Sequence, residues 1–322
     1  MNTRVRFAPS PTGQVHIGNI RTAIFNWLFA RNTKGKFLLR IEDTDRERSS
    51  NEAIEQLLIE LQWLKIDYDE QIFYQSSRFD NHNDTAKKLL HSGKAYRFAK
   101  GEGGEATLFR IPWDAADFTN IRDREMVIVD LHPEVPVKID YHGISYAQIS
   151  KKGKPIPVSA CLAGYRRLEI FDQGGNTRFQ LDPEIEKVLI HHQNITINSP
   201  ARMTFLRRDV VFTDLIKGEL AKPLDSMNNL VIVRSDGTPV FHLANVCDDI
   251  EQKISHIIRG DDHIENTYRH ILLFQALGVY PPAYAHLPMI VNSQGKPYSK
   301  RDGDAYTGQL REHGYLSEVV FN

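Results

Sequence analysis

The 322-residue sequence contains little cysteine, no long apolar run and almost no net charge. Its two cysteines, Cys161 and Cys247, are too few for a disulfide framework or a four-thiolate zinc site, and no histidines stand at ligand spacing beside them. No stretch approaches the roughly 18 apolar residues of a membrane span, and the N-terminus lacks the apolar core of a signal peptide. We therefore expect a cytoplasmic protein in a reducing compartment, without structural zinc or a membrane partner.

Charge and composition narrow the class of protein further. Lysine and arginine number 40 against 41 aspartate and glutamate, so the formal net charge is −1 and any affinity for nucleic acid must come from local patches. Glycine (20) and proline (15) are too scarce for a collagenous or low-complexity chain, and 41% hydrophobic residues suffice for a folded core. At roughly 100 to 200 residues per domain, the length predicts about two domains.

Strand and helix patterns alternate through the first part of the chain. Residues 3–7 suit a strand that ends at Pro-Ser-Pro-Thr-Gly, a helix begins near Ile17, and an apolar run at 37–41 suits a second strand. Two more periodic stretches, from Asn51 and around 86–90, predict helices. Such alternation predicts an α/β fold with a doubly wound parallel sheet, whose ligand site lies beyond the carboxyl ends of its strands.

The pattern changes between about residues 101 and 208, where short β-branched runs alternate with turn clusters and residues 172–176 suit a hairpin loop. The α/β pattern returns from Val210, so the parallel sheet is predicted to be split by a β-rich insertion. Cys247 stands in a strand-like apolar setting and is most simply a small core residue. The elements expected after the insertion are strands at 230–233 and 254–259 and a helix at 266–277.

Two short segments carry residues suited to phosphate chemistry. The first runs from Arg6 to Gly13 and continues into His16-Ile17-Gly18-Asn19 at a strand-to-helix junction. A helix N-terminus offers unpaired N–H groups, Gly18 allows a ligand to approach the backbone, and His16 can donate to a phosphate. This arrangement suits a nucleoside triphosphate, although a helix cap with a surface histidine gives the same tetrapeptide.

The second segment is Lys296-Pro297-Tyr298-Ser299-Lys300-Arg301, flanked by Gly295 and Gly303. Three cations around a serine, hinged by glycines, are able to close over a pyrophosphate and neutralise charge on the leaving group. A solvated basic loop is the alternative interpretation of the segment in isolation.

Both segments, in this order, belong to a longer set of phrases that resembles the class I aminoacyl-tRNA synthetases, and within them the glutamyl-tRNA synthetases. The phrases are RFAPSPTGQVHIGN, LLRIEDTDRERS, VIVRSDGTPVFHLANVCDD, HIIRGDDHIENTYRHILLFQALG and SKRDGD. The resemblance runs through residues 4–97 and again through 209–322. It implies the class I synthetase fold, a Rossmann-type doubly wound parallel sheet split here by a β-rich insertion.

The resemblance also implies a division of the chain. We expect the first half of the catalytic domain at 1–98, an inserted acceptor-stem module at 99–208, the second half at 209–282, and the mobile-loop signature with the start of a stem-contact region at 283–322. The family's anticodon-binding domain is absent after Asn322, where a family phrase breaks off. We therefore expect either a fragment cut at a domain edge or a natural short form.

The activity implied by the resemblance has two steps. ATP and L-glutamate give glutamyl-adenylate, and the glutamyl group then passes to the 3′ end of tRNA(Glu), with bound tRNA generally required before activation. Neither step needs a protein nucleophile, so catalysis is positioning and electrostatic stabilisation. The expected partners of a monomeric enzyme are L-glutamate, tRNA(Glu) and ATP with Mg²⁺. We expect no protein metal site, because magnesium is held largely by the phosphates, although Asp43 and Asp45 also permit a magnesium cluster.

Match to the family motifs assigns roles to single residues. Glutamate recognition needs a cation for a carboxylate, for which the planar fork of arginine is suited, and an acceptor such as Glu42 for the ammonium group. An ordinary ion pair at strand ends is the alternative for Arg6 and Glu42. The expected catalytic residues are His16, Ser299 and Lys300; the ATP-binding residues are Pro9, His16, Gly18, Asn19, Lys296, Ser299, Lys300 and Arg301; the glutamate-binding residues are Arg6, Ala8, Ser10, Glu42, Phe241 and Arg259.

Three departures from the family pattern bear on these roles. Asn19 stands where a second histidine is usual, and its amide is still able to hydrogen-bond. Pro297 replaces the first lysine of the mobile-loop signature, with Lys296 beside it. Phe241 replaces a tyrosine of the glutamate site and removes one hydroxyl, at a cost of about 1 kcal/mol in a buried network.

The insertion and the shortened C-terminus leave other functions open. Residues 113–208 do not match the usual acceptor-stem module, and their basic side chains are equally typical of a solvated face. The alternatives are a short paralogue that glutamylates a modified base in tRNA(Asp) and a tRNA-binding paralogue without catalysis. The first normally carries zinc-binding cysteines, which are absent here, and the retained motif residues argue against the second. The candidate RNA contacts are Lys151, Lys152, Lys154, Arg166 and Arg167.

Overall fold

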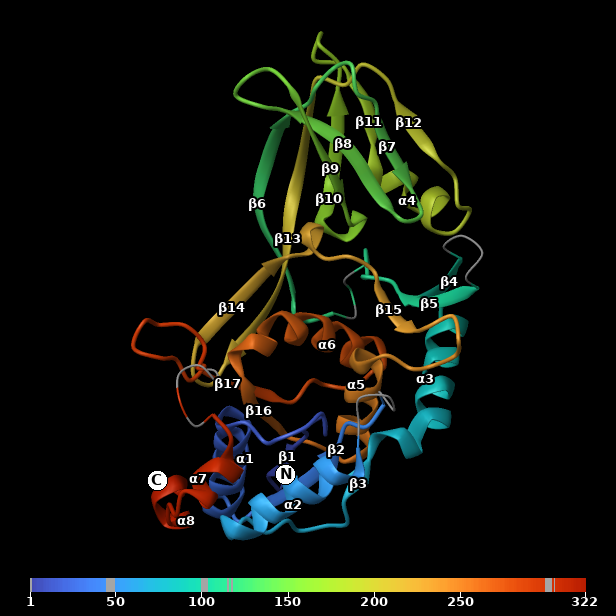
Figure 1. The fold of residues 1–322 in the computed structure, drawn as a ribbon. Helices are drawn as coiled ribbons and strands as arrows, with labels where there is room; N and C mark the ends of the chain where they lie inside the picture. The colour runs from blue at the N-terminus through green and yellow to red at the C-terminus, as the bar shows by residue number, and fades with distance from the viewer. Residues whose placement is uncertain are drawn as a thin grey trace.

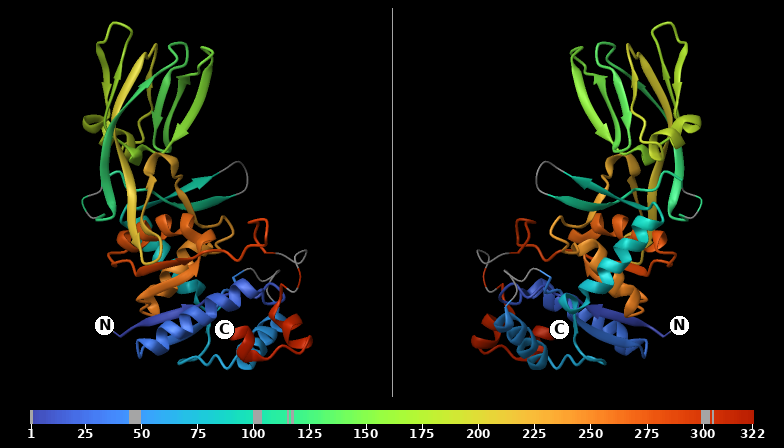
Figure 2. Two further views of the ribbon diagram at one scale, coloured as in Figure 1. Left: turned by 90° about the vertical axis from the view of Figure 1, so that its left-hand side faces the viewer. Right: turned by 90° about the vertical axis from the view of Figure 1, so that its right-hand side faces the viewer.

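The structure is a computed structural model that describes residues 2–44, 50–99, 104–114, 116, 118–298, 303 and 305–322. An α/β body carries both ends of the chain, and a β-rich lobe stands above it (Figure 1). The side views in Figure 2 show the lobe rising from one end of the body. None of the helices in the described residues has the length and apolarity that crossing a bilayer requires.

Parallel strands form the centre of the body. Strands β1, β2 and β3 pair in parallel in that order, and β16 pairs in parallel with β17. The backbone N–H of Ser255, just before β16, donates to the carbonyl oxygen of Arg4 in β1 at 2.9 Å, so the two groups of strands lie side by side. The strands are β1 (Arg4–Phe7), β2 (Lys36–Ile41), β3 (Phe73–Tyr74), β16 (His256–Gly260) and β17 (Ala283–Leu287).

Helices cover both faces of these strands, as β2 demonstrates. Phe37 and Leu39 are buried in an apolar core with residues of α1 and α2, whereas Leu38 is buried in a second core with residues of α3, α5 and α6. A strand buried on both faces explains why every residue after Lys36 in β2 is buried and why all of them but Arg40 are apolar. The predicted doubly wound α/β fold is therefore confirmed. The helices are α1 (Ile17–Asn32), α2 (Asn51–Trp63), α3 (Phe79–His91), α5 (Phe241–Glu251) and α6 (Ile264–Ala276).

Local sequence sets the junctions between these elements. Ser50 caps α2, since its hydroxyl oxygen accepts from the backbone N–H of Ala53 at 3.1 Å. Between α1 and β2, a Cβ on Gly35 would stand 2.4 Å from the carbonyl oxygen of Thr3, so only glycine fits there. Replacing a core residue such as Leu39 by alanine should cost about 2–5 kcal/mol of unfolding free energy.

The β-rich lobe has its own apolar core between two antiparallel arrays. In one array the long strands β6 and β13 pair with each other, and β13 also pairs with β10 and β14. The strands of this array are β6 (Ile121–Asp130), β10 (Tyr165–Phe171), β11 (Thr177–Gln180), β13 (Arg202–Asp214) and β14 (Gly218–Pro223). The other array and its helix are β7 (Val137–Asp140), β8 (Gly143–Ile149), β9 (Pro155–Ala160), β12 (Ile195–Ile197) and α4 (Leu181–Leu189).

Strand β13 joins the lobe to the body. It begins in the lobe at Arg202 and ends at Asp214, which pairs in parallel with Tyr284 of β17. Residue 208, the expected boundary between insertion and catalytic domain, lies inside this strand. The remaining elements are β4 (Ala95–Ala99), β5 (Glu105–Phe109), β15 (Leu230–Val233), α7 (Thr307–Glu312), α8 (Ser317–Phe321) and the 3₁₀ turns η1 (Gln75–Arg78), η2 (Leu162–Gly164), η3 (Leu224–Ser226) and η4 (Asp261–His263).

One local expectation was wrong. Cys247 lies on helix α5, where Leu243 to Asp249 are all buried, and not on a strand. Because α5 is buried around its circumference, with Asn245, Asp248 and Asp249 among the buried residues, its sequence does not show the separate apolar and solvent-facing sides that distinguish a helix from a strand. The expected core position of Cys247 is confirmed, and burial raises the pKa of its thiol to about 12.

Candidate active site

A cavity of about 460 Å³ opens beyond the carboxyl ends of β1 and β16, where the sequence places the ligand site. It is walled by the segment after β1, the first turn of α1, one side of α5 and the end of β16. The chain after β17 closes one side through residues that include Met289 and Tyr298. Ten of the expected site residues line this cavity together: Arg6, Ala8, Pro9, Ser10, His16, Gly18, Asn19, Glu42, Phe241 and Arg259.

The second expected segment is only partly described. Lys296 is exposed in a tight turn, where its backbone N–H donates to Asn292 Oδ1 at 3.0 Å, and it does not line the cavity. Pro297 and Tyr298 do line it. The other expected residues of this segment, Ser299, Lys300 and Arg301, lie outside the described residues.

His16 begins helix α1 and caps it. Its Nδ1 accepts from the backbone N–H of Gly18 at 3.1 Å, so Nδ1 carries no proton and Nε2 is the donor. The neighbouring amides are also engaged, because Ile17 N–H donates to Ala305 at 3.0 Å and Asn19 N–H donates to the His16 carbonyl oxygen at 2.9 Å. A phosphate at this helix end would therefore meet the side chains of His16 and Asn19 and the positive end of the helix dipole, and not free backbone amides.

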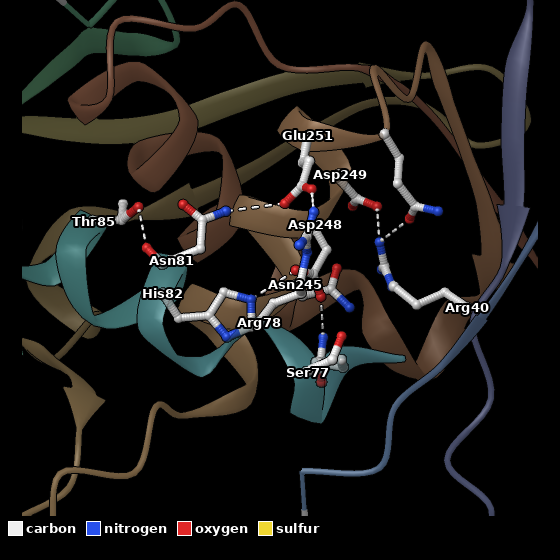
Figure 3. A network of polar contacts seen from close by, with 12 residues as sticks. Arg40, Ser77, Arg78, Asn81, His82, Thr85, Asn245, Asp248, Asp249 and Glu251 are labelled. Carbon is white, nitrogen blue, oxygen red and sulfur yellow. Dashed lines mark hydrogen bonds and ion pairs between the residues drawn. The ribbon is translucent and has the colours of Figure 1, made fainter. Parts of the chain in front are cut away.

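Arg6 and Glu42 belong to a buried network of charged groups. Arg6 Nε donates to Asp249 Oδ1 at 3.0 Å, and Arg40 Nη1 donates to the same oxygen at 2.7 Å. Glu42 accepts from Arg40 Nη2 at 3.4 Å and from Asn245 Nδ2 at 2.6 Å. Figure 3 shows Arg40 directed at Asp249 of α5. The ion pair that the sequence left open for Arg6 exists, but its partner is Asp249 and not Glu42.

Burial and neighbouring charges act in opposite directions within this network. Burial alone would raise the pKa of Asp249, but Arg40 and Arg6 bring it below its ordinary value. Burial also raises the pKa of Glu42, and the opposing effect of Arg40 and Arg6 does not cancel the rise. Asp249 is thus held as a carboxylate, whereas Glu42 has capacity for a further cationic partner at the cavity wall.

Arg259 stands apart from that network although it is almost as buried as Arg6, with 6% of its surface exposed against 4%. Its Nη2 donates to Thr267 Oγ1 at 2.6 Å and to the His263 carbonyl oxygen at 3.3 Å. Within the described residues no carboxylate forms an ion pair with it. Burial lowers the pKa of Arg259 to about 10. Among the described residues, the cavity therefore contains a buried guanidinium that lacks an anionic partner, which is the arrangement expected of a carboxylate site.

Sequence reasoning missed several residues that support the site. Arg40, Asn245 and Asp249 hold Arg6 and Glu42 through side-chain hydrogen bonds. Asn245 and Asp249 are four residues apart and so share one side of α5. Two polar residues at that helical spacing were the available signal.

Other expected groups have different surroundings. Asp43 accepts from the backbone N–H and the hydroxyl of Ser76 at 2.8 and 2.6 Å, which anchors η1, and Asp45 lies outside the described residues. No cluster of three or more metal-ligating side chains occurs in the part of the chain that the structure describes. The five basic residues expected to contact RNA are all exposed and lie on either side of strand β9: Lys151, Lys152 and Lys154 in the turn before it, and Arg166 and Arg167 in β10 after it.

Comparison with known proteins identifies a matching family. The model of a family described as tRNA synthetases class I (E and Q), catalytic domain, matches residues 2–102 and 183–322. The unmatched stretch, 103–182, lies mostly in the β-rich lobe.

A glutamate–tRNA ligase from Polynucleobacter necessarius subsp. necessarius (strain STIR1) is 36% identical over 322 residues, covering 100% of this chain and 57% of that protein. One from Thermodesulfovibrio yellowstonii is 37% identical over 322 residues, covering 99% and 55%. A crystal structure of a glutamate tRNA ligase from Elizabethkingia meningosepticum CCUG26117, in complex with its amino acid, superposes with a TM-score of 0.63 at 26% identity and covers 99% of this chain and 59% of that one. The chain thus spans less than three fifths of the length of these relatives.

Proposed function

Because the chain belongs to the class I tRNA synthetase family for glutamate and glutamine, in its catalytic domain, we propose that it is the catalytic part of a glutamate–tRNA ligase. The cavity binds L-glutamate and ATP, forms glutamyl-adenylate, and transfers the glutamyl group to the 3′ end of tRNA(Glu). The observation that carries this proposal is Arg259, a buried cation at the cavity wall without an acidic partner among the described residues. A ligand carboxylate supplies that partner.

A second charged group supports an amino acid as the ligand. Glu42 lines the same cavity, and burial raises its pKa. A ligand ammonium group beside Glu42 favours the ionised carboxylate, so the cavity offers Glu42 for an ammonium group and Arg259 for a carboxylate. Arg259 also favours glutamate over glutamine, because a neutral amide would leave the guanidinium without a counter-charge.

The residues of the first turn of α1 that line the cavity are the evidence for ATP as the second ligand. His16 Nε2 is a donor there, and the N-terminus of the helix carries positive potential. We assign contacts with the α-phosphate to His16 and, on the family resemblance alone, to Ser299 and Lys300. Magnesium enters with ATP, bound to its phosphates.

The chemistry needs no protein nucleophile. In activation, an oxygen of the glutamate α-carboxylate attacks the α-phosphorus in line, the bond to the pyrophosphate oxygen breaks, and pyrophosphate leaves with the electron pair. In transfer, a hydroxyl of the terminal ribose attacks the activated carbonyl carbon, the bond from that carbon to the phosphate oxygen breaks, AMP leaves with the electron pair, and the hydroxyl proton is released. The protein contributes orientation of the reactants and donors for the charge that develops on the phosphate oxygens.

The proposal extends to the lobe and to the state of the protein in the cell. Positioned between the two halves of the catalytic sequence, the lobe serves as a platform for the acceptor stem, with Lys151, Lys152, Lys154, Arg166 and Arg167 as its candidate phosphate contacts. We propose a monomer in the cytoplasm.

The test is glutamate-dependent exchange of pyrophosphate into ATP, measured with and without tRNA(Glu). Exchange that requires tRNA is expected of a glutamate–tRNA ligase. Exchange without tRNA would favour the short paralogue that modifies tRNA(Asp). No exchange, either with or without tRNA(Glu), would favour the non-catalytic alternative. Glutamine in place of glutamate should give no exchange.

The phosphate end of the proposal has its own test. If Lys300 stabilises the transition state, Lys300→Ala should lower kcat for activation by about 100-fold or more while changing the KM for ATP little. Steady-state kinetics of the exchange reaction measure both constants, and an unchanged kcat would remove this role from Lys300.

A further inference from the structure

Arg259 is held by a group of side chains that the site motifs do not contain. We call Asp214, Thr267 and His286 the Arg259 clamp. They come from the end of β13, from α6 and from β17, and each is buried. His286 is the register partner of Arg259 in the parallel pair of β16 and β17, so the two side chains are placed by the sheet itself.

Hydrogen bonds within the clamp define the state of His286. Asp214 Oδ2 lies 2.6 Å from His286 Nδ1, and Asp214 Oδ1 accepts from the backbone N–H groups of Ile216 and Lys217 at 2.9 and 3.0 Å. Burial alone would raise the pKa of Asp214, but these donors bring it below its ordinary value. Asp214 is therefore an anion that only accepts, and His286 Nδ1 must carry the proton.

The opposite nitrogen of His286 is consequently an acceptor. Burial lowers the pKa of His286 to about 4 although the bond to Asp214 raises it, so the imidazole is neutral at pH 7. Its Nε2 lies 3.3 Å from Arg259 Nε and 2.9 Å from Thr267 Oγ1. Arg259 Nη2 donates to Thr267 Oγ1 at 2.6 Å.

The clamp thus holds one edge of the guanidinium through Nε and Nη2. Arg259 Nη1 has no hydrogen-bond partner within the described residues, and Arg259 lines the cavity. The two acceptors in the clamp that touch Arg259, an imidazole nitrogen and a hydroxyl oxygen, are both neutral. They orient the guanidinium without cancelling its charge, whereas a carboxylate in the same place would compete with a ligand carboxylate.

We propose that the Arg259 clamp positions the guanidinium for ligand binding, with His286, fixed by Asp214 as a neutral acceptor, as its central positioning residue. This inference rests on the proposed function, because it takes the carboxylate that Arg259 binds to be the side-chain carboxylate of L-glutamate. His286 does not touch the substrate. It orients Arg259, which contacts the substrate. Through Asp214, it also connects the amino-acid pocket to β13, the strand shared with the lobe.

Two amide substitutions separate the two nitrogens of His286. The amide of His286→Asn reaches the position of Nδ1 and loses the acceptor at Nε2, whereas the amide of His286→Gln reaches the position of Nε2 and retains an acceptor for Arg259. In tRNA-dependent ATP–pyrophosphate exchange by the full protein, His286→Asn should raise the KM for glutamate by about tenfold. His286→Gln should raise it by no more than about threefold, and both variants should keep the KM for ATP within about twofold of the wild type.

A matched buried pair provides the control. His82 Nε2 lies 2.7 Å from Asp248 Oδ1, both side chains are fully buried, and His82 is outside the cavity. His82→Asn should lower the melting temperature about as much as His286→Asn does and leave the KM for glutamate unchanged. If His286→Asn fails to fold, Thr267→Val serves instead, because it keeps the shape of the side chain and removes the hydroxyl that Arg259 Nη2 contacts; we expect a rise of about fivefold in the KM for glutamate.

Three results would overturn the inference. The first is a KM for glutamate that stays within twofold of the wild type in His286→Asn, or in Thr267→Val in its place. The second is a KM for ATP that rises as much as the KM for glutamate. The third is the same rise in the KM for glutamate in His82→Asn. A wild-type protein without glutamate-dependent exchange would instead overturn the proposed function, and this inference with it.

Discussion

Two buried arginines, Arg6 of β1 and Arg259 of β16, line the same cavity, and their surroundings differ. Arg6 is paired with Asp249, which also holds Arg40, so its charge is neutralised inside the protein. Arg259 is equally buried and has only neutral acceptors around it in the described residues. A buried cation without a counter-charge is costly for folding, and it is retained where a ligand supplies the missing charge. From this comparison we propose that Arg6 supports the site and that Arg259 binds the ligand.

The largest effect should come from removing the charge of Asp249, which pairs with Arg6 and Arg40. Asp249→Asn leaves Arg6 and Arg40 buried with only Glu42 to balance them, so the free energy of unfolding should fall by about 3–5 kcal/mol. Urea denaturation of wild type and variant measures this difference. A loss below about 1 kcal/mol would mean that the network around Asp249 contributes little and that Arg6 is free to bind a ligand.

Removing the charge of Arg259 should affect glutamate binding strongly and stability little. Arg259→Met keeps much of the side-chain volume and removes a buried charge, so stability should stay within about 1 kcal/mol of the wild type or rise. The KM for glutamate should increase by about 100-fold, since a bidentate contact with a carboxylate is lost. Exchange kinetics and urea denaturation of the same variant test both statements, and Arg6→Met, which should lose stability, is the matched comparison. A large loss of stability in Arg259→Met would erase the distinction between the two arginines.

A smaller effect concerns Phe241, which lines the cavity at the start of α5. Phe241→Tyr restores a hydroxyl that the family pattern usually has, and a hydrogen bond from it should lower the KM for glutamate by about fivefold, or about 1 kcal/mol. An unchanged or higher KM would show that the pocket on the Arg259 side is already complete without this hydroxyl. Glutamate titration in the exchange reaction decides between the two.

The smallest effect is a difference in pH dependence within the paired network. The pKa of Asp249 is lowered in the folded protein, so its contribution to stability is present above its unfolded pKa of about 3.9 and is lost as the pH falls through the folded value. The pKa of Glu42 is raised by burial, so its contribution is present below its unfolded pKa of about 4.3 and declines as the pH rises through the folded value. Urea denaturation of wild type and Glu42→Gln between pH 3 and 7 should show that the decline is absent from the variant. A decline of equal size in the variant would contradict the assignment to Glu42.

The sequence predicted more of the residues that line the cavity than of the residues that hold those lining residues in place. Arg6, His16, Glu42 and Arg259 lie in local motifs at strand ends and a helix start, and all four line the cavity. The alternation of strands and helices likewise predicted the parallel sheet, because strands and helices differ in their apolar period.

The supporting residues could not be predicted in the same way. Asp249 lies 243 residues from Arg6, and Asp214 lies 72 residues from His286, so these pairs exist only through the tertiary fold. The sequence around Cys247 was also interpreted as a strand, because helix α5 buries polar as well as apolar residues and so has no separate solvent-facing side. The tautomer of His286 could not be predicted either, because Asp214, which sets it, lies at the end of a strand that begins in the inserted lobe.

The most direct test of the central claim is a crystal structure of the protein with L-glutamate bound. The account predicts a ligand carboxylate oxygen about 2.7–3.1 Å from Arg259 Nη1, with Arg6 still bonded to Asp249 and His286 still between Asp214 and Arg259. A carboxylate bound instead by Arg6, with Asp249 displaced from it and Arg259 left without an anion, would contradict the account.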